Sequence, residues 1–176
     1  TFWDDYETLA NDTKNRPLTN RATQGRYAPG STFKMLTSIA ALDTGTITVG
    51  ETIPCTGRYT FYSDAISQPF CWLRSGHGPD NVTKAITDSC DVFFYDAGRR
   101  TTIAKIDEYA KKFGLGEYTG IEIPEAKGHV AGPETSAMYD QPWYDGNTMY
   151  AAIGQGMNEF TPLQLANYVA TLVNGG

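Results

Sequence analysis

Two short motifs contain side chains that could together carry out acyl transfer. In APGSTFK, residues 28–34, Ser31 follows Pro29-Gly30 and Lys34 comes three positions later. This spacing places both side chains on one face of a helix start. A serine hydroxyl becomes a strong nucleophile when a neighbouring base takes its proton, and a lysine can be that base when desolvation lowers its pKa. A helix N-terminus also favours negative charge developing on an attacked carbonyl.

The second motif is Ser89-Cys90-Asp91, within the run AITDSCDVFFYDAG. It falls between two short apolar runs, where serine and aspartate are also common N-cap residues. In a catalytic role, Ser89 could pass a proton to a leaving amine, and Asp91 could hold Lys34 or a substrate amide by hydrogen bonds. A Ser-x-x-Lys spacing alone arises by chance about once in a chain of this length, so the catalytic interpretation depends on both motifs together.

A third group consists of Cys55, Cys71, His77 and Cys90, all between residues 55 and 90. Three cysteines and one histidine are a ligand set for tetrahedral zinc, although the short Cys-x2-Cys pair typical of zinc sites is missing. An odd number of cysteines cannot all pair within one chain. A zinc site, one disulfide with a free thiol, and three buried thiols all remain open. His129, in AKGHVAG, has no partner pattern and is expected in a solvated loop.

Composition indicates a globular domain, or part of one, with no affinity for nucleic acid. The chain has 176 residues, 40% of them hydrophobic, and 14 Lys+Arg against 20 Asp+Glu give a net charge of -6. That balance makes a basic, phosphate-binding surface improbable. No apolar run approaches the roughly 18 residues that span a bilayer. The first residues, TFWDDYETL, have neither the basic region nor the cleavage site of a signal peptide.

The elements that must position these motifs are mostly helices. The apolar spacing and the end signals predict helices at 3–10, 31–43, 81–87, 91–100 and 102–113, and one starting at Thr161. Thr161-Pro162-Leu163-Gln164 has the form of a capping box with proline at the first helical position. A Gly-, Thr- and Pro-rich stretch at 50–79 predicts a small hairpin or irregular insertion, and residues 114–147 are expected to be mostly loop.

Four ordered segments resemble signatures of one family. NRATQGRYAPGSTFK, SCDVFFY, TGIEIPEAKG and AAIGQGMNEFTPLQLANYVATLVNGG are similar to segments of class B penicillin-binding proteins. The resemblance is strongest to the elongation-type, penicillin-binding protein 2-like D,D-transpeptidases, with sporulation-type relatives close behind. The family carries the motifs S-x-x-K, S-x-N and K-T-G. Asp91 stands where asparagine is more common, a variant typical of the elongation-type subset.

The resemblance implies a fold and a domain. Residues 1–176 would be a single partial transpeptidase domain: the mainly α helical subdomain of an α+β fold shared with serine β-lactamases. It would carry a small irregular β insertion, with most of the central sheet missing. The chain contains no K-T-G motif, which in the family binds substrate carboxylate and supplies an oxyanion-hole N–H group. We therefore expect weak or no activity from this fragment alone, and a parent protein anchored outside the cytoplasm by an N-terminal helix not in this chain.

The resemblance also implies a chemistry. Ser31 would form an acyl-enzyme with a stem peptide ending in D-Ala-D-Ala, or with a β-lactam antibiotic, with Lys34 as its base and Ser89 and Asp91 as the second motif. No cofactor is needed for this transfer, and the parent would work with the cell-elongation machinery. Gly154-Gln155-Gly156 would support the site structurally. Relatives of the elongation type bind zinc at positions similar to the Cys/His group, whereas sporulation-type relatives form a disulfide at positions like Cys71 and Cys90; a Cys55–Cys71 disulfide is a further alternative.

Two other functions remain alternatives. A serine β-lactamase would need a deacylating glutamate, and Glu125 lies about where such enzymes keep one. Because IEIPEAKG resembles the transpeptidase pattern instead, we expect Glu125 to be structural. The second alternative is a non-catalytic module that is stabilised by zinc or senses β-lactams. The intact set of Ser31, Lys34 and Ser89 argues against it.

Overall fold

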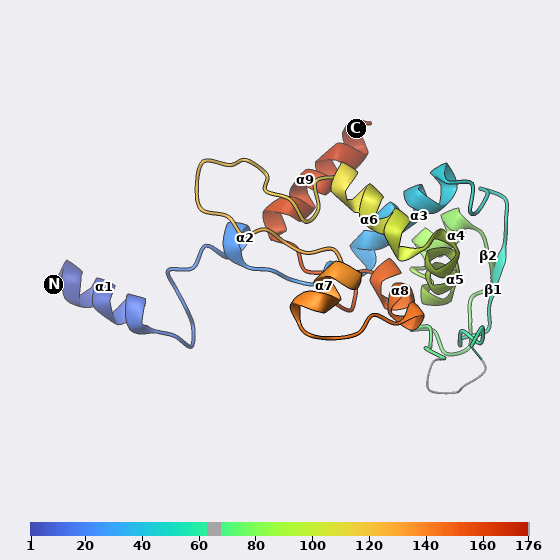
Figure 1. Ribbon diagram of the computed structural model, residues 1–176, viewed down its shortest axis with the longest axis horizontal. Helices are drawn as coiled ribbons and strands as arrows, with labels where there is room; N and C mark the ends of the chain where they lie inside the picture. Colours follow the sequence, from blue (N-terminus) through green and yellow to red (C-terminus); the bar gives the residue numbers. More distant parts are fainter. Residues whose placement is uncertain (63–67, 176) are drawn as a thin grey trace.

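The computed structural model describes residues 1–62 and 68–175 of the chain (Figure 1). Within these ranges the fold is mainly helical, as predicted, with one two-stranded sheet. None of the described helices is both long and apolar enough to cross a membrane. The elements in chain order are α1 (Phe2–Asn11), α2 (Arg21–Gln24), the 3-10 turn η1 (Gly30–Phe33), α3 (Lys34–Asp43), β1 (Ile53–Cys55), β2 (Gly78–Asp80), α4 (Val82–Thr87), α5 (Asp91–Thr101), α6 (Ile103–Lys112), α7 (Pro133–Met138), α8 (Asp145–Ala152) and α9 (Pro162–Asn174).

Helix α5 lies at the centre of the helical body, with α3, α4, α6 and α8 around it (Figure 1). Its first turns, DVFFY, are buried on several sides, because each neighbouring helix covers a different face. Contact with α8 is so close that a Cβ atom at Gly98 would lie 2.2 Å from the Cβ of Ala152. Glycine at this position therefore sets the distance between α5 and α8.

Two apolar clusters make up the core, and α3 contributes to both. Ala41 on one side of α3 packs with the cluster formed around α5 and β1. Phe33, Leu36 and Ala40 pack with the second cluster, which α6 and α9 complete. A helix buried on both sides has little freedom to shift, so the residues at its start are rigidly placed.

The predicted insertion forms a small antiparallel hairpin. Strands β1 and β2 pair in the register Ile53 with Asp80, Pro54 with Pro79 and Cys55 with Gly78. A single bridge between Arg58 and Phe70 continues this pairing. Residues 63–67 of the insertion lie outside the described residues. The hairpin packs against α5 and so brings Cys55 close to the start of that helix.

The last helix, α9, begins as its sequence predicts. Thr161 Oγ1 accepts the N–H of Gln164, and the Gln164 side chain accepts the N–H of Thr161, which together form a capping box. Tyr168, in the middle of α9, is fully buried and donates its hydroxyl to the carbonyl oxygen of Thr32 at 3.1 Å. The helix thereby braces the turn that contains Ser31.

Two features of the fold differ from the prediction. Residues 114–147 are mostly loop, as expected, but they also contain all of α7 and the start of α8, which were not predicted. The signals of α7 were present in Pro133 at the first helical position and Glu134 in the first turn. Helix α8 has no side-chain cap and no apolar stripe, since it is covered on several sides. In addition, Ser31 lies in the 3-10 turn η1, and the α-helix begins only at Lys34.

Helix α1 stands apart from this body at the N-terminus (Figure 1). It has a complete capping box at Thr1, yet none of its residues is buried. Four large apolar side chains are exposed along it: Phe2, Trp3, Tyr6 and Leu9. The helix takes no part in positioning the sequence motifs described above.

Candidate active site

Ser31 is exposed on the turn η1, immediately before α3. The turn is held from the far end of the chain, because the N–H of Gly30 donates to the carbonyl oxygen of Gly154 at 2.9 Å. A Cβ atom at Gly154 would lie 2.2 Å from the Gly30 oxygen and 2.7 Å from the Phe33 Cβ. The backbone of Gly154 has φ +73, which also favours glycine. The expected structural support from Gly154 is therefore a direct contact with the serine turn.

Lys34 is buried, and its Nζ atom has three hydrogen-bond partners. Its side chain is 3% exposed, and Nζ donates to Ser89 O at 2.8 Å, to Ser89 Oγ at 3.0 Å and to Asp91 Oδ1 at 2.6 Å. Nζ also lies over the ring of Phe94, 5.6 Å from the ring centroid. A lysine in this environment has a fixed position, because each of its donors is used and water is largely excluded.

Ser89 links the two motifs. Its hydroxyl donates to Ser31 Oγ at 2.9 Å and accepts from Lys34 Nζ, so a continuous path of hydrogen bonds joins Ser31 to Lys34. Ser89 has φ +52, an uncommon backbone conformation for a residue with a side chain. Residues held in such conformations are often found at functional sites. The turn between α4 and α5 thus presents the Ser89 hydroxyl to both partners.

Asp91 completes the group as the first residue of α5. Cys90, not Ser89 or Asp91, is the N-cap of this helix, and no side chain caps it. One oxygen of Asp91 therefore remains available for Lys34, and the other accepts the N–H of Trp72 at 3.0 Å. The structure brings together all four side chains that the sequence analysis selected. It adds Trp72, whose contribution through a backbone N–H leaves no signal in the sequence.

Chemically, this arrangement is suited to nucleophilic substitution at a carbonyl group. An exposed hydroxyl, a path for its proton and a buried amine lie in one chain of hydrogen bonds. In the structure these bonds run from Lys34 through Ser89 to Ser31, so they must reverse, with a neutral Lys34 accepting from Ser89 Oγ, for the proton to leave Ser31 Oγ as the oxygen attacks. The carboxylate of Asp91 balances the charge of the amine after it gains a proton.

The Cys/His group also comes together, directly behind the start of α5. The four ligand atoms of Cys55, Cys71, His77 and Cys90 all lie within 4.8 Å of one another. His77 Nδ1 is 3.6 Å from Cys55 Sγ and 3.5 Å from Cys71 Sγ, so this nitrogen faces the sulfur atoms. All three cysteines are free and buried. The ligand types and their convergence fit a tetrahedral Cys3His site, with His77 binding through Nδ1.

Neighbouring polar groups hold this cluster, called here the Cys/His cluster. Asp80 is fully buried, and burial together with Asp80 and Cys55 raises the pKa of the Cys90 thiol well above its ordinary value. Lys84 donates to the carbonyl oxygen of His77 at 2.9 Å and to Asp80. His77 Nε2 is buried and has no hydrogen-bond partner among the described residues. A bound cation would favour the thiolate form and oppose the effect of burial on Cys90.

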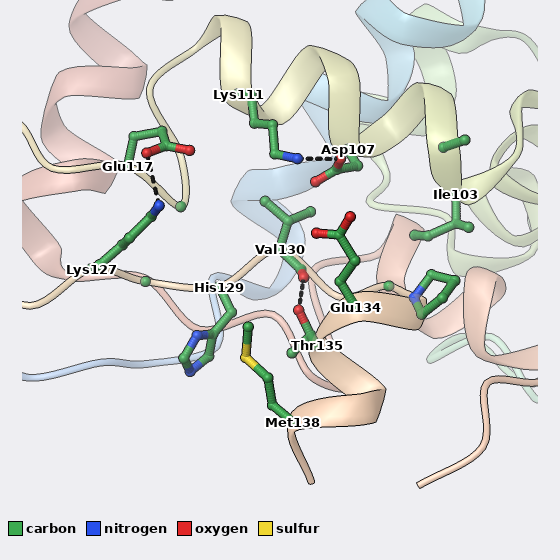
Figure 2. A pocket seen from close by; sticks show the side chains of 15 residues that line it. Ile103, Asp107, Lys111, Glu117, Lys127, His129, Val130, Glu134, Thr135 and Met138 are labelled. Carbon is green, nitrogen blue, oxygen red and sulfur yellow. Dashed lines mark hydrogen bonds and ion pairs between the residues drawn. The ribbon is translucent and has the colours of Figure 1, made fainter. Parts of the chain in front are cut away.

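One cavity lies away from both of these groups. It has a volume of about 600 Å³ between α6, α7 and the loop 116–132, and Figure 2 shows its lining. Its charged rim is mostly self-paired, Lys111 with Asp107 and Lys127 with Glu117. None of the described residues that line it belongs to the Ser31 site or to the Cys/His cluster. This cavity therefore does not locate the chemistry of the two serine motifs.

His129 and Glu125 also differ in how they compare with the expectations from the sequence. His129 lines the cavity, contacts Arg26 and lies 3.6 Å from Glu159, so it is not the partnerless solvated histidine that was expected. Burial and the Arg26 cation lower the pKa of His129. The Glu125 carboxylate accepts from the N–H groups of Thr119 and Gly120 and from the Thr119 hydroxyl, at 2.8 to 3.0 Å. Through these bonds Glu125 closes the loop between residues 119 and 125, in agreement with a structural role.

Comparison with known proteins places this geometry in a family. Residues 4–176 match the family described as penicillin binding protein transpeptidase domain. Peptidoglycan D,D-transpeptidase MrdA of Escherichia coli K12 is 38% identical over 180 residues, which cover 98% of this chain and 27% of that protein. The chain thus spans about a quarter of the length of this curated relative.

Solved structures agree with the sequence match. A Pseudomonas aeruginosa PBP2 crystallised with WCK 5153 superposes with a TM-score of 0.88 at 34% identity, over 99% of this chain and 40% of that one. A Helicobacter pylori PBP2 in complex with MreC gives a TM-score of 0.87 at 34% identity, over 98% and 32% of the two chains. From the fold, the convergence of the two serine motifs and these matches, the chain belongs to the penicillin-binding protein transpeptidase family and is PBP2-like.

Proposed function

We propose that this chain carries the acylated serine of a peptidoglycan D,D-transpeptidase. The observation that supports the proposal most directly is the hydrogen-bonded path from Ser31 through Ser89 to Lys34, with Asp91 on the far side. In this role Ser31 is the nucleophile, Lys34 is the base, Ser89 relays the proton and Asp91 holds the lysine. The substrate is a stem peptide that ends in D-Ala-D-Ala, as the named activity of the relatives suggests.

The proposed reaction has two substitutions. Ser31 Oγ attacks the carbonyl carbon of the penultimate D-Ala while its proton moves through Ser89 to the neutral amine of Lys34. The C–N bond to the terminal D-Ala breaks, and that amine takes the proton back as it leaves. The amine of a second stem peptide then attacks the acyl-enzyme and restores Ser31. A β-lactam would follow the first half only, because its leaving amine stays tethered to the acyl group.

A fluorescent penicillin tests this function. We expect stoichiometric, covalent labelling of the full-length protein at Ser31 and no labelling of the Ser31→Ala variant. Labelling that persists in Ser31→Ala would overturn the assignment of the nucleophile. Rapid turnover of a chromogenic β-lactam would instead favour the β-lactamase alternative. If the full-length protein takes up no label and forms no cross-links between stem peptides, the non-catalytic alternative would be correct.

We further propose that residues 1–176 form only part of the transpeptidase domain. The chain has no K-T-G motif and spans about a quarter of its curated relative. An oxyanion site needs donors on the side of the carbonyl away from the base, and the K-T-G strand would supply one. We therefore expect the 176-residue chain alone to react with the fluorescent penicillin far more slowly than the full-length protein. Equal rates for the two would contradict this division.

We also propose that the Cys/His cluster binds zinc in a structural role. Support comes from four ligand atoms within 4.8 Å and from the orientation of His77 Nδ1 toward two sulfur atoms. Zinc would supply folding free energy at the start of α5 and would take no part in the acyl transfer. Metal analysis of protein purified without added zinc should give one zinc per chain. No zinc with one disulfide by mass spectrometry would support the redox alternative, and no zinc with three thiols the buried-thiol alternative.

The proposed substrate and partners lie outside the cytoplasm. Peptidoglycan cross-linking takes place on that side of the membrane, so we propose an extracytoplasmic protein that works with the cell-elongation machinery. The Helicobacter pylori PBP2 complex with MreC is a precedent for a partner of this kind. Fractionation of cells that express the full-length protein, followed by labelling with a penicillin that cannot cross the inner membrane, would test the location.

A further inference from the structure

Trp72 contacts the chain on both sides of Ser89. Its indole Nε1–H donates to the carbonyl oxygen of Asp88 at 3.0 Å, one residue before Ser89. Its backbone N–H donates to Asp91 Oδ2 at 3.0 Å, two residues after Ser89. One residue therefore holds both ends of the turn that presents the Ser89 hydroxyl.

This turn needs such support because of its conformation. Ser89 has φ +52, which costs free energy for any residue with a Cβ atom. The turn is closed from inside by the N–H of Ser89 on Ile86 O at 3.2 Å and the N–H of Cys90 on Ala85 O at 2.9 Å. Lys34 holds it from the side of α3 through Ser89 O. Trp72 supplies the contacts on the opposite side, from the insertion between α3 and α4.

Trp72 holds the Ser89 turn by hydrogen bonds and not by packing in the hydrophobic core. Its side chain is 61% exposed, so burial contributes little of its interaction with the protein. Its ring meets His77 edge-on, with 5.3 Å between ring centroids. It directly follows the buried Cys71 of the Cys/His cluster. Both of its N–H donors nevertheless point to the Ser89 turn.

We propose that Trp72 is a positioning residue that keeps Ser89 in its left-handed conformation and so aims the Ser89 hydroxyl at Ser31. This inference rests on the proposed function for its effect on acylation, but its structural part does not. Trp72 acts through Ser89 and does not touch the reacting atoms. Its indole N–H is the part that can be removed without changing the backbone.

The test compares Trp72→Phe with Trp3→Phe in the full-length protein. Phenylalanine keeps an aromatic ring and the backbone N–H but removes the indole donor. Trp3 is also exposed, on α1 away from the site. The first readout is hydrogen exchange of the Ser89 and Cys90 amides, which close the turn. We expect exchange to be faster by about fivefold in Trp72→Phe and unchanged in Trp3→Phe.

The second readout is the acylation rate constant for a β-lactam, measured separately from its reversible binding constant. We expect Trp72→Phe to lower the rate constant by about tenfold and to change binding by less than about twofold. The same substitution is then made in a Ser89→Ala background. If Trp72 acts through the Ser89 hydroxyl, its effect there should fall below about twofold.

Three results would overturn the inference. They are unchanged exchange at Ser89 and Cys90, an unchanged acylation rate constant, and an equal loss of rate in the Ser89 and Ser89→Ala backgrounds. A wild-type protein that is not acylated at Ser31 would overturn the proposed function instead. In that event the exchange comparison alone would decide whether Trp72 holds the turn.

Discussion

The Ser31 site and the Cys/His cluster adjoin each other, yet they differ in how completely their polar atoms are satisfied. In the Ser31 site, Lys34 Nζ has three hydrogen-bond partners at 2.6 to 3.0 Å. In the Cys/His cluster, the contacts from His77 Nδ1 to sulfur are 3.5 and 3.6 Å, and His77 Nε2 has no partner among the described residues. The polar atoms around Lys34 therefore have their hydrogen-bond partners, whereas the atoms of the Cys/His cluster are arranged like the ligands of a metal ion.

The two groups nevertheless depend on the same stretches of backbone. Cys90 is followed by Asp91, and Cys71 is followed by Trp72, whose N–H binds Asp91. A metal ion bound by Cys71 and Cys90 would therefore restrict the motion of the next residues, Trp72 and Asp91, which hold Ser89 and Lys34. The difference between the regions indicates that the Ser31 site carries out the chemistry and that the Cys/His cluster keeps the surrounding backbone rigid. Substitutions confined to one region test this division.

Ser31→Ala should give the largest effect and should leave the Cys/His cluster unchanged. Removing the nucleophile is expected to lower the acylation rate by at least ~10³-fold. Because Ser31 is exposed and its hydroxyl contributes one hydrogen bond, zinc content and melting temperature should stay those of the wild type. Covalent labelling, metal analysis and thermal unfolding measure the three quantities. A lost metal in this variant would break the proposed separation.

Cys55→Ser addresses the other region. Cys55 is the cluster residue on strand β1 and is not adjacent in sequence to any residue of the Ser31 site. If zinc is bound, losing one of four ligands should lower the free energy of unfolding by about 3 kcal/mol and reduce zinc content. Acylation of the protein that remains folded should keep most of its rate. The exposed neighbour Thr56→Ser serves as control, and equal stability of the two variants would argue against a bound metal.

Asp91→Asn tests the residue that lies between the two regions. The amide keeps the size of the side chain but removes the negative charge beside the buried Lys34. We expect the acylation rate to fall roughly 30- to 100-fold, with little change in zinc content, because Asp91 contributes no cluster ligand. A matched Asp88→Asn substitution in the same turn, at a partly buried carboxylate that pairs with Lys84, should have a much smaller effect on the acylation rate. Loss of zinc in Asp91→Asn would show that the regions are not separable.

Glu125→Gln should have the smallest effect, because Glu125 bonds only to its own loop in the hydrogen bonds described above. Hydrogen bonds from Thr119 and Gly120 lower the pKa of Glu125, so the ionised form contributes stability above the ordinary pKa of glutamate. That contribution should be lost as the pH falls below about 4. Glu125→Gln should thus melt slightly earlier at pH 7 but equally at low pH, with acylation and deacylation unchanged. A slower deacylation would revive the β-lactamase alternative.

The sequence predicted those parts of the molecule that depend on local signals. The helix after Thr161 followed from its capping box, and the helices at 91–101 and 103–112 followed from their apolar spacing. The contact between Asp91 and Lys34 was one of the two interactions considered for Asp91, the other being with a substrate amide. Residue type and spacing were sufficient in these cases.

Other parts depend on contacts that leave no local signal. Helix α8 lacks both a cap and an apolar stripe, so it appeared as part of a loop. His129 looked solvated because its neighbour Arg26 is far away in the sequence. Trp72 uses a backbone N–H and an indole N–H, and neither group distinguishes it from any other exposed tryptophan. Only the folded arrangement identifies such roles.

The long-range contacts that fix the serine turn also set the order of events during synthesis. Thr37 Oγ1 donates to Ala152 O, 115 positions away, and Tyr168 donates to Thr32 O across 136 positions. At ribosomal speeds, the partners of this turn emerge on the order of ten seconds after Ser31 itself. In a growing chain, Ser31 is therefore synthesised well before the residues that hold its turn. Because fast acylation also needs the K-T-G segment, reactivity toward a penicillin should appear only after both that segment and this turn are in place.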